Sequence, residues 1–165
     1  MPSFSPDGSR LVTVGGEETA RVWDAATGAE VLALKGHARW VCHAAFSADG
    51  TRVVTAGEDA TVRVWDAASG KEVLALTGHV GPVMTASLSR DGSRIVSGGY
   101  DTTVRVWDAR TGDELLTLKG HRHPLSWAAF TPDGARVVSW DRASVLRVWG
   151  EAPLPVMAGA AAPAR

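Results

Sequence analysis

The chain has 165 residues, of which 45% are apolar, 17 are Lys or Arg and 18 are Asp or Glu. The nearly balanced charge disfavours a nucleic-acid surface, and the apolar fraction supports a packed core rather than a disordered chain. The single cysteine, Cys42, excludes an internal disulfide, no segment approaches the roughly 18 apolar residues of a membrane span, and the N-terminus lacks a signal-peptide pattern. We therefore expect a cytoplasmic protein that binds neither nucleic acid nor a membrane.

Four of the seven tryptophans recur at a constant interval of 42 residues: Trp23, Trp65, Trp107 and Trp149. Gly-His pairs and Asp-Gly pairs return at the same interval. A fixed period of this length is the signature of a repeat protein, in which each unit is one small supersecondary structure. The units cover approximately residues 1–35, 36–77, 78–119 and 120–151.

The predicted elements, taken in chain order, are short strands separated by turns. In the second unit, apolar or β-branched segments at 40–46, 52–57, 61–65 and 72–77 are divided by Ser, Asp and Gly. Asp-Gly and Ser-Gly pairs are typical of tight hairpin turns, because glycine readily adopts the left-handed backbone conformation. Segments this short and rich in valine are poor helix formers. We expect four strands in this unit and almost no helix in the chain.

The outer units are less complete than the middle two. Phe4 aligns with Phe46, so the first unit holds only the last residues of an innermost strand, and three well-formed strands are expected there. Three are also expected in the fourth unit, because no convincing outermost strand follows Trp149. The Pro/Ala-rich segment 152–165 is expected to be a disordered tail or a degenerate strand.

The spacing of these motifs carries a resemblance. A tryptophan follows each Gly-His histidine by 28 residues, and in the second and third units it begins a Trp-Asp pair. This pattern resembles the WD-repeat β-propeller family. The resemblance implies an all-β fold in which each 42-residue unit is a blade of four antiparallel strands. Because rings of this kind typically close with four to eight blades, we expect an incomplete ring, a ring of about eight blades completed by a second copy, or an open arc.

The resemblance also assigns a buried hydrogen-bonded network of His, Ser or Thr, Asp and Trp to each blade. The matching residues are His37, Thr55, Asp59 and Trp65, then His79, Ser97, Asp101 and Trp107, then His121, Ser139 and Trp149. In the fourth unit Ala143 replaces the aspartate, so His121 is expected to lose its carboxylate unless the loop is remodelled to bring in Asp141. The first unit keeps Thr13 and Trp23 but has no Gly-His pair.

Catalytic and metal sites are weaker interpretations of the same residues. Ser, His and Asp could form a catalytic triad, but an active site is rarely repeated in identical register, and no G-x-S-x-G motif is present. Cys42, His43, His121 and His123 lie two repeats apart and lack the paired spacing of metal ligands. We expect no enzymatic activity, no cofactor and no metal.

Binding is expected at positions that vary between otherwise similar units. In WD-repeat proteins, loops at one end of the blades grip peptides or partner proteins. The variable positions matching these loops include large aromatic and charged residues, which are common in binding hot spots: Trp40, Glu58, Tyr100, Arg122 and Arg142. Alternatively, Trp40 packs against a neighbouring blade and the arginines are merely solvated. Trp127 and Trp140 are open to either interpretation.

These observations favour a non-catalytic protein–protein interaction scaffold that presents this loop face to a protein or peptide, with self-association as a further possibility. The alternative is a fragment of the regulatory or sensor domain of a larger bacterial multidomain enzyme, such as a kinase or nucleotide hydrolase. The 14 Arg against 3 Lys indicate a GC-rich, bacterial origin.

Overall fold

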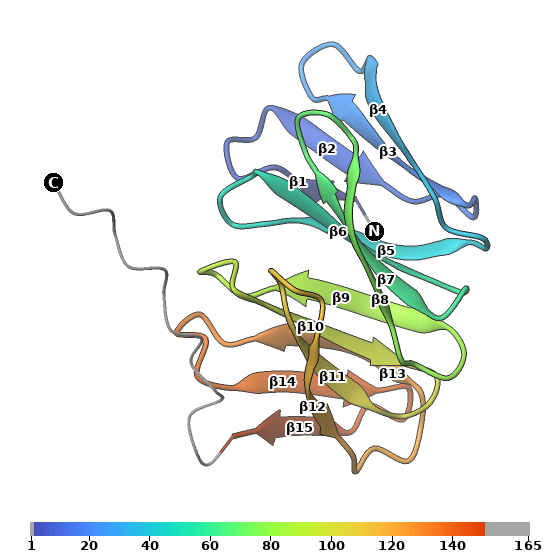
Figure 1. Ribbon diagram of the computed structural model, residues 1–165, viewed down its shortest axis with the longest axis vertical. Helices are drawn as coiled ribbons and strands as arrows, with labels where there is room; N and C mark the ends of the chain where they lie inside the picture. The colour runs from blue at the N-terminus through green and yellow to red at the C-terminus, as the bar shows by residue number, and fades with distance from the viewer. Residues whose placement is uncertain (1, 151–165) are drawn as a thin grey trace, which may run out of the picture.

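The computed structural model describes residues 2–150, and within them it has fifteen strands and no helix. The all-β prediction is therefore confirmed. No helix in this range has the length and apolarity needed to cross a membrane. The chain forms four antiparallel sheets that follow one another in chain order along the long axis of the molecule (Figure 1).

Each sheet is built from consecutive strands, and we call the sheets blades 1 to 4. Blade 1 contains β1 (Ser3–Phe4), β2 (Arg10–Thr13), β3 (Thr19–Asp24) and β4 (Glu30–Lys35). Blade 2 contains β5 (Val41–Phe46), β6 (Arg52–Gly57), β7 (Thr61–Asp66) and β8 (Glu72–Thr77). Blade 3 contains β9 (Val83–Leu88), β10 (Arg94–Gly99), β11 (Val104–Asp108) and β12 (Glu114–Leu118). Blade 4 contains β13 (Leu125–Phe130), β14 (Val137–Asp141) and β15 (Leu146–Trp149).

The two outer blades differ from each other in strand number. In blade 1 the two residues of β1 pair with β2, Ser3 opposite Val12 and Phe4 opposite Leu11, so this blade has a fourth, short strand in addition to the three expected. Blade 4 has three strands among the described residues, as expected. The prediction for segment 152–165 lies outside the described residues.

The hairpin turn between the first two strands of a blade is closed by side chains. In blade 2 the Ser47 hydroxyl donates to Asp49 at 2.5 Å, and the Asp49 carboxylate accepts the Thr51 amide at 3.0 Å. Gly50 adopts φ of 71°, which a residue with a Cβ rarely does. These hydrogen bonds to the ionised carboxylate, led by that from Ser47, lower the pKa of Asp49 to about 2. The turn sets the register of β5 against β6.

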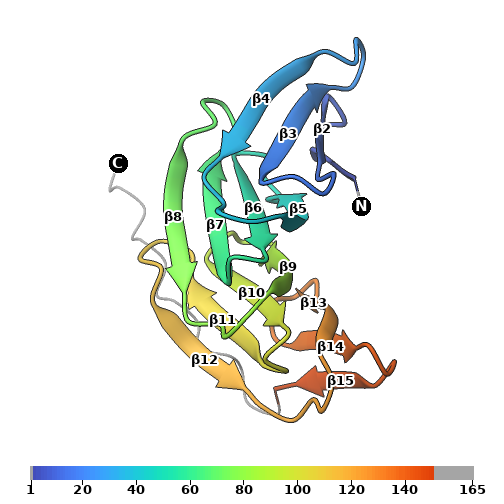
Figure 2. The same cartoon turned by 90° about the vertical axis from the view of Figure 1, so that its right-hand side faces the viewer.

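The blades fan out in an arc, with β4, β8 and β12 along one side and β5, β9 and β13 along the other (Figure 2). We call β1, β5, β9 and β13 the inner strands, and adjacent inner strands lie next to one another. In blades 1 to 3, one apolar face packs against the next blade in the chain. We call this the rear face, and the opposite face, which meets the preceding blade, the front face.

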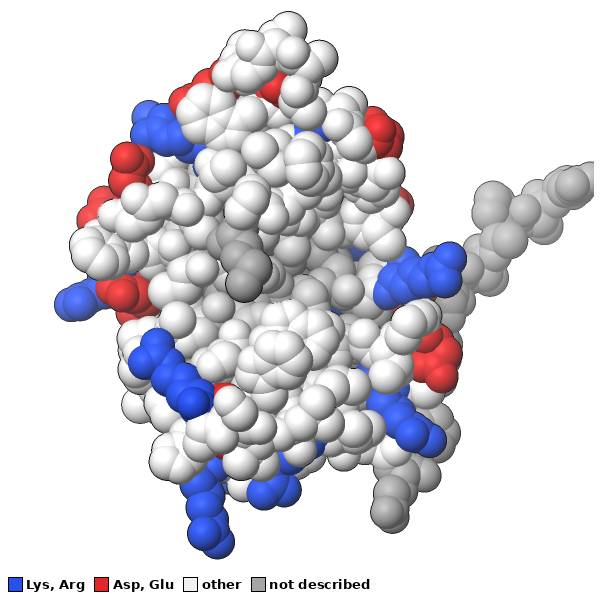
Figure 3. Space-filling model, turned by 180° about the vertical axis from the view of Figure 1, so that it is seen from behind, with Lys and Arg blue, Asp and Glu red and all other residues white. Residues whose placement is uncertain are grey.

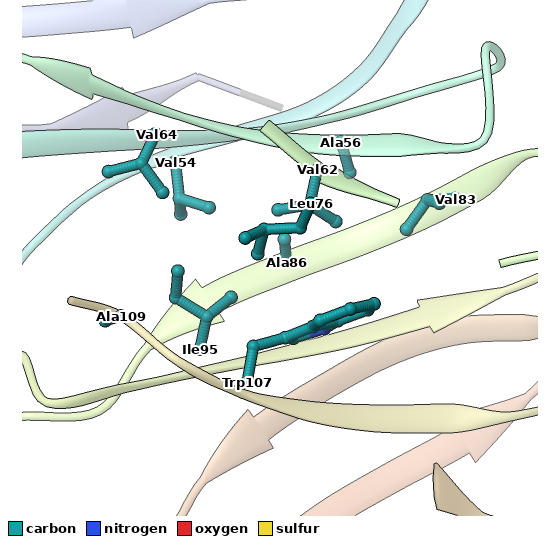
Figure 4. Close-up of a cluster of buried hydrophobic side chains, with 10 residues drawn as sticks. All are labelled: Val54, Ala56, Val62, Val64, Leu76, Val83, Ala86, Ile95, Trp107 and Ala109. Atoms are coloured by element: carbon teal, nitrogen blue, oxygen red, sulfur yellow. The ribbon is translucent and has the colours of Figure 1, made fainter. Parts of the chain in front are cut away.

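The core consists of three junctions between consecutive blades. Between blades 2 and 3 (Figure 4), Val54, Ala56, Val62, Val64 and Leu76 on the rear face meet Val83, Ala86, Ile95, Trp107 and Ala109 on the front face. The Trp107 indole is only 2% exposed because it inserts between the two sheets. Trp65 has the same role between blades 1 and 2, and Trp149 packs at the edge of the junction between blades 3 and 4. The repeated tryptophan is therefore a residue of the blade junction.

Arginine side chains reinforce each junction. Arg52 donates to the Gly92 carbonyl at 2.7 Å, and Arg94 donates to the Gly134 carbonyl at 2.8 Å. The equivalent Arg10 donates to the Ala67 carbonyl. Each bond joins one blade to a turn of the next, so that it satisfies a backbone carbonyl with a charged donor.

A substitution at Gly98 tests how tightly blades 3 and 4 are packed. A Cβ at this position would lie 2.9 Å from the Leu125 Cβ of blade 4 and 3.2 Å from Thr85 Cγ2. Gly98→Ala should therefore lower the free energy of unfolding by about 1–3 kcal/mol, the usual cost of overpacking. Urea denaturation measures this loss.

The matched control is Gly15→Ala, because a Cβ on Gly15 meets nothing within 4 Å. This variant should be within about 0.5 kcal/mol of the parent chain. Equal stabilities for the two variants would contradict the tight junction at Gly98.

Candidate functional site

Blade 2 contains a continuous buried network of polar side chains. The Trp65 indole N–H donates to Thr55 Oγ1 at 2.9 Å, and His37 Nε2 lies 2.7 Å from the same oxygen. His37 Nδ1 lies 3.0 Å from both oxygens of Asp59. Asp59 also accepts the Ala38 amide at 2.9 Å, so the network fixes the start of the Gly-His loop.

Blade 3 repeats this geometry. Trp107 donates to Ser97 Oγ at 2.9 Å, and His79 Nε2 lies 2.8 Å from that oxygen. His79 Nδ1 is 2.9 Å from Asp101 Oδ2, and Asp101 accepts the Val80 amide at 3.0 Å. The structure thus brings together all four residues assigned to this blade from the sequence.

Blade 4 completes its network with a residue from a different position. His121 Nδ1 lies 3.0 Å from Asp141 Oδ2, and His121 Nε2 lies 2.9 Å from Ser139 Oγ. The expectation that His121 loses its carboxylate is therefore wrong. Asp141 stands at the position of Gly57 and Gly99, where a Cβ would lie 2.5 and 2.8 Å from Nδ1 of His37 and His79, so its carboxylate reaches His121 without any change in the turn. Asp141 ends β14, accepts the amides of Ala143 and Val145 at 3.0 Å each, and is 2% exposed.

Blade 1 has only the tryptophan–threonine hydrogen bond of the network. Trp23 donates to Thr13 Oγ1 at 2.8 Å. Glu17 stands at the aspartate position, but it is exposed and pairs with Arg21 at 2.9 Å. Trp23 is also less buried than Trp65 or Trp107, because none of the four described blades covers the front face of blade 1.

Two threonines belong to the networks and were missed by the sequence interpretation. Thr61 Oγ1 donates to Asp59 at 2.8 Å, and Thr103 Oγ1 donates to Asp101 at 2.8 Å. Both stand two residues after the aspartate, at the 42-residue interval. That periodic Asp-x-Thr pattern is the signal that could have identified them.

Neutral histidines satisfy every hydrogen bond of this pattern. The indole can only donate, so the Thr55 hydroxyl accepts from Trp65 and gives its own hydrogen to His37 Nε2, leaving Nδ1–H for Asp59. Burial lowers the pKa of His37 and of His79, although the carboxylate opposes this shift. Burial alone would raise the pKa of Asp59, but hydrogen bonds from the Ala38 amide, Thr61 and His37 together lower it.

The network hydroxyls cannot serve as catalytic nucleophiles. Thr55, Ser97 and Ser139 are each 0% exposed, so no substrate can reach their oxygen atoms. Each oxygen already accepts an indole N–H. The triad interpretation is therefore inconsistent with the geometry. Across residues 2–150, no three His, Cys, Asp or Glu side chains are grouped closely enough to hold a metal ion.

The five predicted contact residues lie at one end of blades 2 to 4, and we call this end the rim. Trp40 is 57% exposed rather than packed against a neighbouring blade, and Arg122 and Arg142 are exposed as well. Glu58 is half-buried, and its amide donates to the Trp40 carbonyl at 2.9 Å. Tyr100 is 38% exposed.

The rim residues do not form a single cluster, because they are distributed over three blades. Arg142 and Tyr100 are in contact, with the guanidinium carbon 4.7 Å from the ring centroid. Trp127 and Trp140 also stack, with centroids 5.2 Å apart, but they do so on the rear face of blade 4. Those two tryptophans therefore belong to an end of the arc and not to the rim.

The network predicts a loss of stability in acid. A buried histidine with a lowered pKa stays neutral in the folded chain while the unfolded chain takes up a proton, so stability falls as the pH drops below about 6.5. His37, His43 and His79 all have lowered pKa values, chiefly through burial. The lowered pKa values of Asp59 and Asp101 add a second loss below about pH 4.

Urea denaturation between about pH 7 and about pH 5 measures the histidine part of this loss. His79→Gln should show a smaller decrease in stability over that range than the parent chain. The control His123→Gln alters an exposed histidine and should keep the full decrease. A pH dependence unchanged in His79→Gln would contradict the buried neutral imidazole.

Asp141 provides a separate test of the network in blade 4. Because it is the buried partner of His121, Asp141→Ala should lower the urea midpoint of unfolding about as far as Asp101→Ala does. The control Asp113→Ala changes an exposed aspartate in a hairpin turn and should have a small effect. An Asp141→Ala variant as stable as this control would place His121 outside any carboxylate network.

Comparison with protein families matches the WD40 model, "WD domain, G-beta repeat", to residues 3–24, 28–66 and 70–108. The matched segments cover more than half of the chain and end at the last strand residue of β11 in blade 3. A search of curated proteins found no match to the chain. With the four antiparallel sheets and the repeated junction tryptophans, these matches show that the chain belongs to the WD40 repeat family.

Proposed function

We propose that this protein is a non-catalytic scaffold whose rim binds a protein or peptide partner. WD40 repeats generally mediate protein–protein interactions, and domains of this family are generally non-catalytic. The observation that carries the proposal is the exposed contact between Arg142 and Tyr100 across blades 3 and 4. Aromatic and arginine side chains that are both exposed and held in place are typical of binding hot spots.

The loops that carry these residues are held by the buried networks. Asp59 binds the amide of Ala38 in the Gly-His loop, and the Glu58 amide binds the Trp40 carbonyl. The amides of Tyr100 and Arg142 make the equivalent bonds to Pro82 and Pro124. A loop fixed in this way loses little conformational entropy when a partner binds, which favours affinity.

The chemistry of the rim favours an acidic peptide with apolar side chains. Arg39, Arg122 and Arg142 are exposed at the rim, where Arg142 lies over the ring of Tyr100, and arginine binds carboxylates with two parallel hydrogen bonds. Seen from the inner-strand side, the middle of the described surface carries almost no charged side chains, which lie toward its margin (Figure 3). Recognition by charge is therefore expected at the rim.

Selection of peptides from a random library on the immobilised full chain tests this proposal. The selected peptides should be enriched in Asp and Glu, and the double variant Tyr100→Ala, Arg142→Ala should bind them at least about tenfold more weakly. The control Arg110→Ala removes an exposed arginine at the opposite end of blade 3 and should bind like the parent chain. Unchanged binding by the double variant would remove these residues from the partner site.

A further inference from the structure

Among residues 2–150, no segment covers the rear face of blade 4, although the matching faces of blades 1 to 3 are buried. Trp140, Leu146 and Val148 on this face are 44%, 57% and 54% exposed. Their counterparts one repeat earlier, Gly98, Val104 and Val106, are buried. Nothing in the local sequence makes this face polar, so it presents the same apolar surface that elsewhere forms a junction.

The front face of blade 1 is uncovered in the complementary way. Phe4 is 63% exposed, and a hollow of about 350 Å³ is lined by Phe4, Leu11, Thr13 and Trp23, among others. The equivalent residues of blade 2 are Phe46, Val53, Thr55 and Trp65, of which Val53 and Trp65 are buried against blade 1 and Phe46 packs beside them.

The two uncovered faces are thus the two halves of one junction. We propose that the rear face of blade 4 docks onto the front face of blade 1 in a second copy of this chain, head to tail. The three internal junctions supply the template, because each joins a rear face to a front face in the same register. The contact is independent of the rim and of its proposed partner.

Trp140 favours a second copy over an ordinary complete blade as the occupant. In blade 3 this position is Gly98, where even a Cβ would lie 2.9 Å from Leu125 of the next blade. In blades 1 and 2 the same position holds Val14 and Ala56, opposite Val41 and Val83, so an indole is much larger than any side chain that the three internal junctions accommodate there. Blade 1 has no side chain at the Leu125 position among the described residues, because β1 begins at Ser3, the counterpart of Ala129.

The stacked pair of Trp127 and Trp140 would fill that space. Its counterparts in blade 3 are Thr85 and Gly98, which are both much smaller and are buried in the junction with blade 4. In the proposed contact, the two tryptophans therefore lie opposite the short inner strand β1 of the second copy, which has only two residues.

Arg136 adds a polar contact to the proposed junction. Arg10, Arg52 and Arg94 each donate to a backbone carbonyl of the next blade, and Arg136 holds the same position in blade 4. Its side chain is exposed. In the head-to-tail contact, Arg136 would donate to the backbone carbonyl of Gly8 or Ala25 in the second copy. These two residues hold the repeat positions whose carbonyls accept the arginine bonds at the internal junctions.

Light scattering of the full chain at increasing concentration tests the proposal. Assemblies of at least twice the 17.3 kDa mass of one chain are expected. Two copies joined by two such contacts form a closed ring. Copies that dock without closing form an open oligomer with a free face at each end, and both products use the same junction. A strictly monomeric protein at every concentration would overturn the proposal and assign the two faces to another occupant.

Two variants establish which faces meet. Leu146→Glu places a charge on the rear face of blade 4, and Phe4→Glu places one on the front face of blade 1; both residues are exposed, so folding should be preserved, as circular dichroism will verify. Each variant alone should be monomeric. An equimolar mixture should form a dimer containing one copy of each, because each variant retains one intact face.

The mixture distinguishes this contact from other modes of association. Self-association of either variant alone, or failure of the mixed variants to associate, would contradict a head-to-tail junction. Val80→Glu is the matched control, since Val80 is an exposed apolar residue at the rim and its replacement should leave association intact. Trp140→Gly should weaken association at least about tenfold, because it removes the side chain that fills the space beside β1.

Discussion

The structure depends on one constraint: a blade has two apolar faces, and neither can be left in water without cost. A single sheet of three or four short strands cannot bury both of its own faces, so it needs a neighbour on each side. At each junction, the repeated tryptophan on the front face of one blade packs against a valine-rich rear face of the preceding blade. The burial of these side chains follows from this packing: Trp65 and Trp107 are almost inaccessible between blades, whereas Trp23, on a face that no other described blade covers, is only partly buried.

The polar networks connect this packing to recognition. Trp65 is both a junction residue and the donor that begins the chain of hydrogen bonds through Thr55 and His37 to Asp59. Asp59 in turn holds the loop that leads to Trp40 at the rim. Packing in the core and the position of a rim loop are therefore linked within each blade, so that a scaffold of rigid repeats can carry different side chains at its edge without losing its shape.

Three features were predicted wrongly, only in part or not at all from the sequence, and each depends on contacts in the folded chain. Asp141 replaces the missing carboxylate because it stands at the position of Gly57 and Gly99, where a side chain points directly at the network histidine. This proximity to the histidine is not visible in the sequence, since the turn itself keeps its place in all three blades. The short strand β1 forms because Ser3 and Phe4 find partners on β2, which depends on pairing rather than on strand propensity. Trp127 and Trp140 could not be assigned because only the arrangement of the blades shows that they stack at an end of the arc.

The repeat length and the strand pattern follow from the sequence alone, because each is set by local spacing that recurs every 42 residues. The four-residue networks of blades 2 and 3 were identified through the resemblance that this spacing carries, whereas Thr61 and Thr103 were missed. The tertiary structure decides which faces are covered and which carboxylate reaches His121. It also decides that Arg142 of blade 4 lies over Tyr100 of blade 3. These features depend on contacts between blades and on the paths of loops, so they exist only once the repeats have packed against one another.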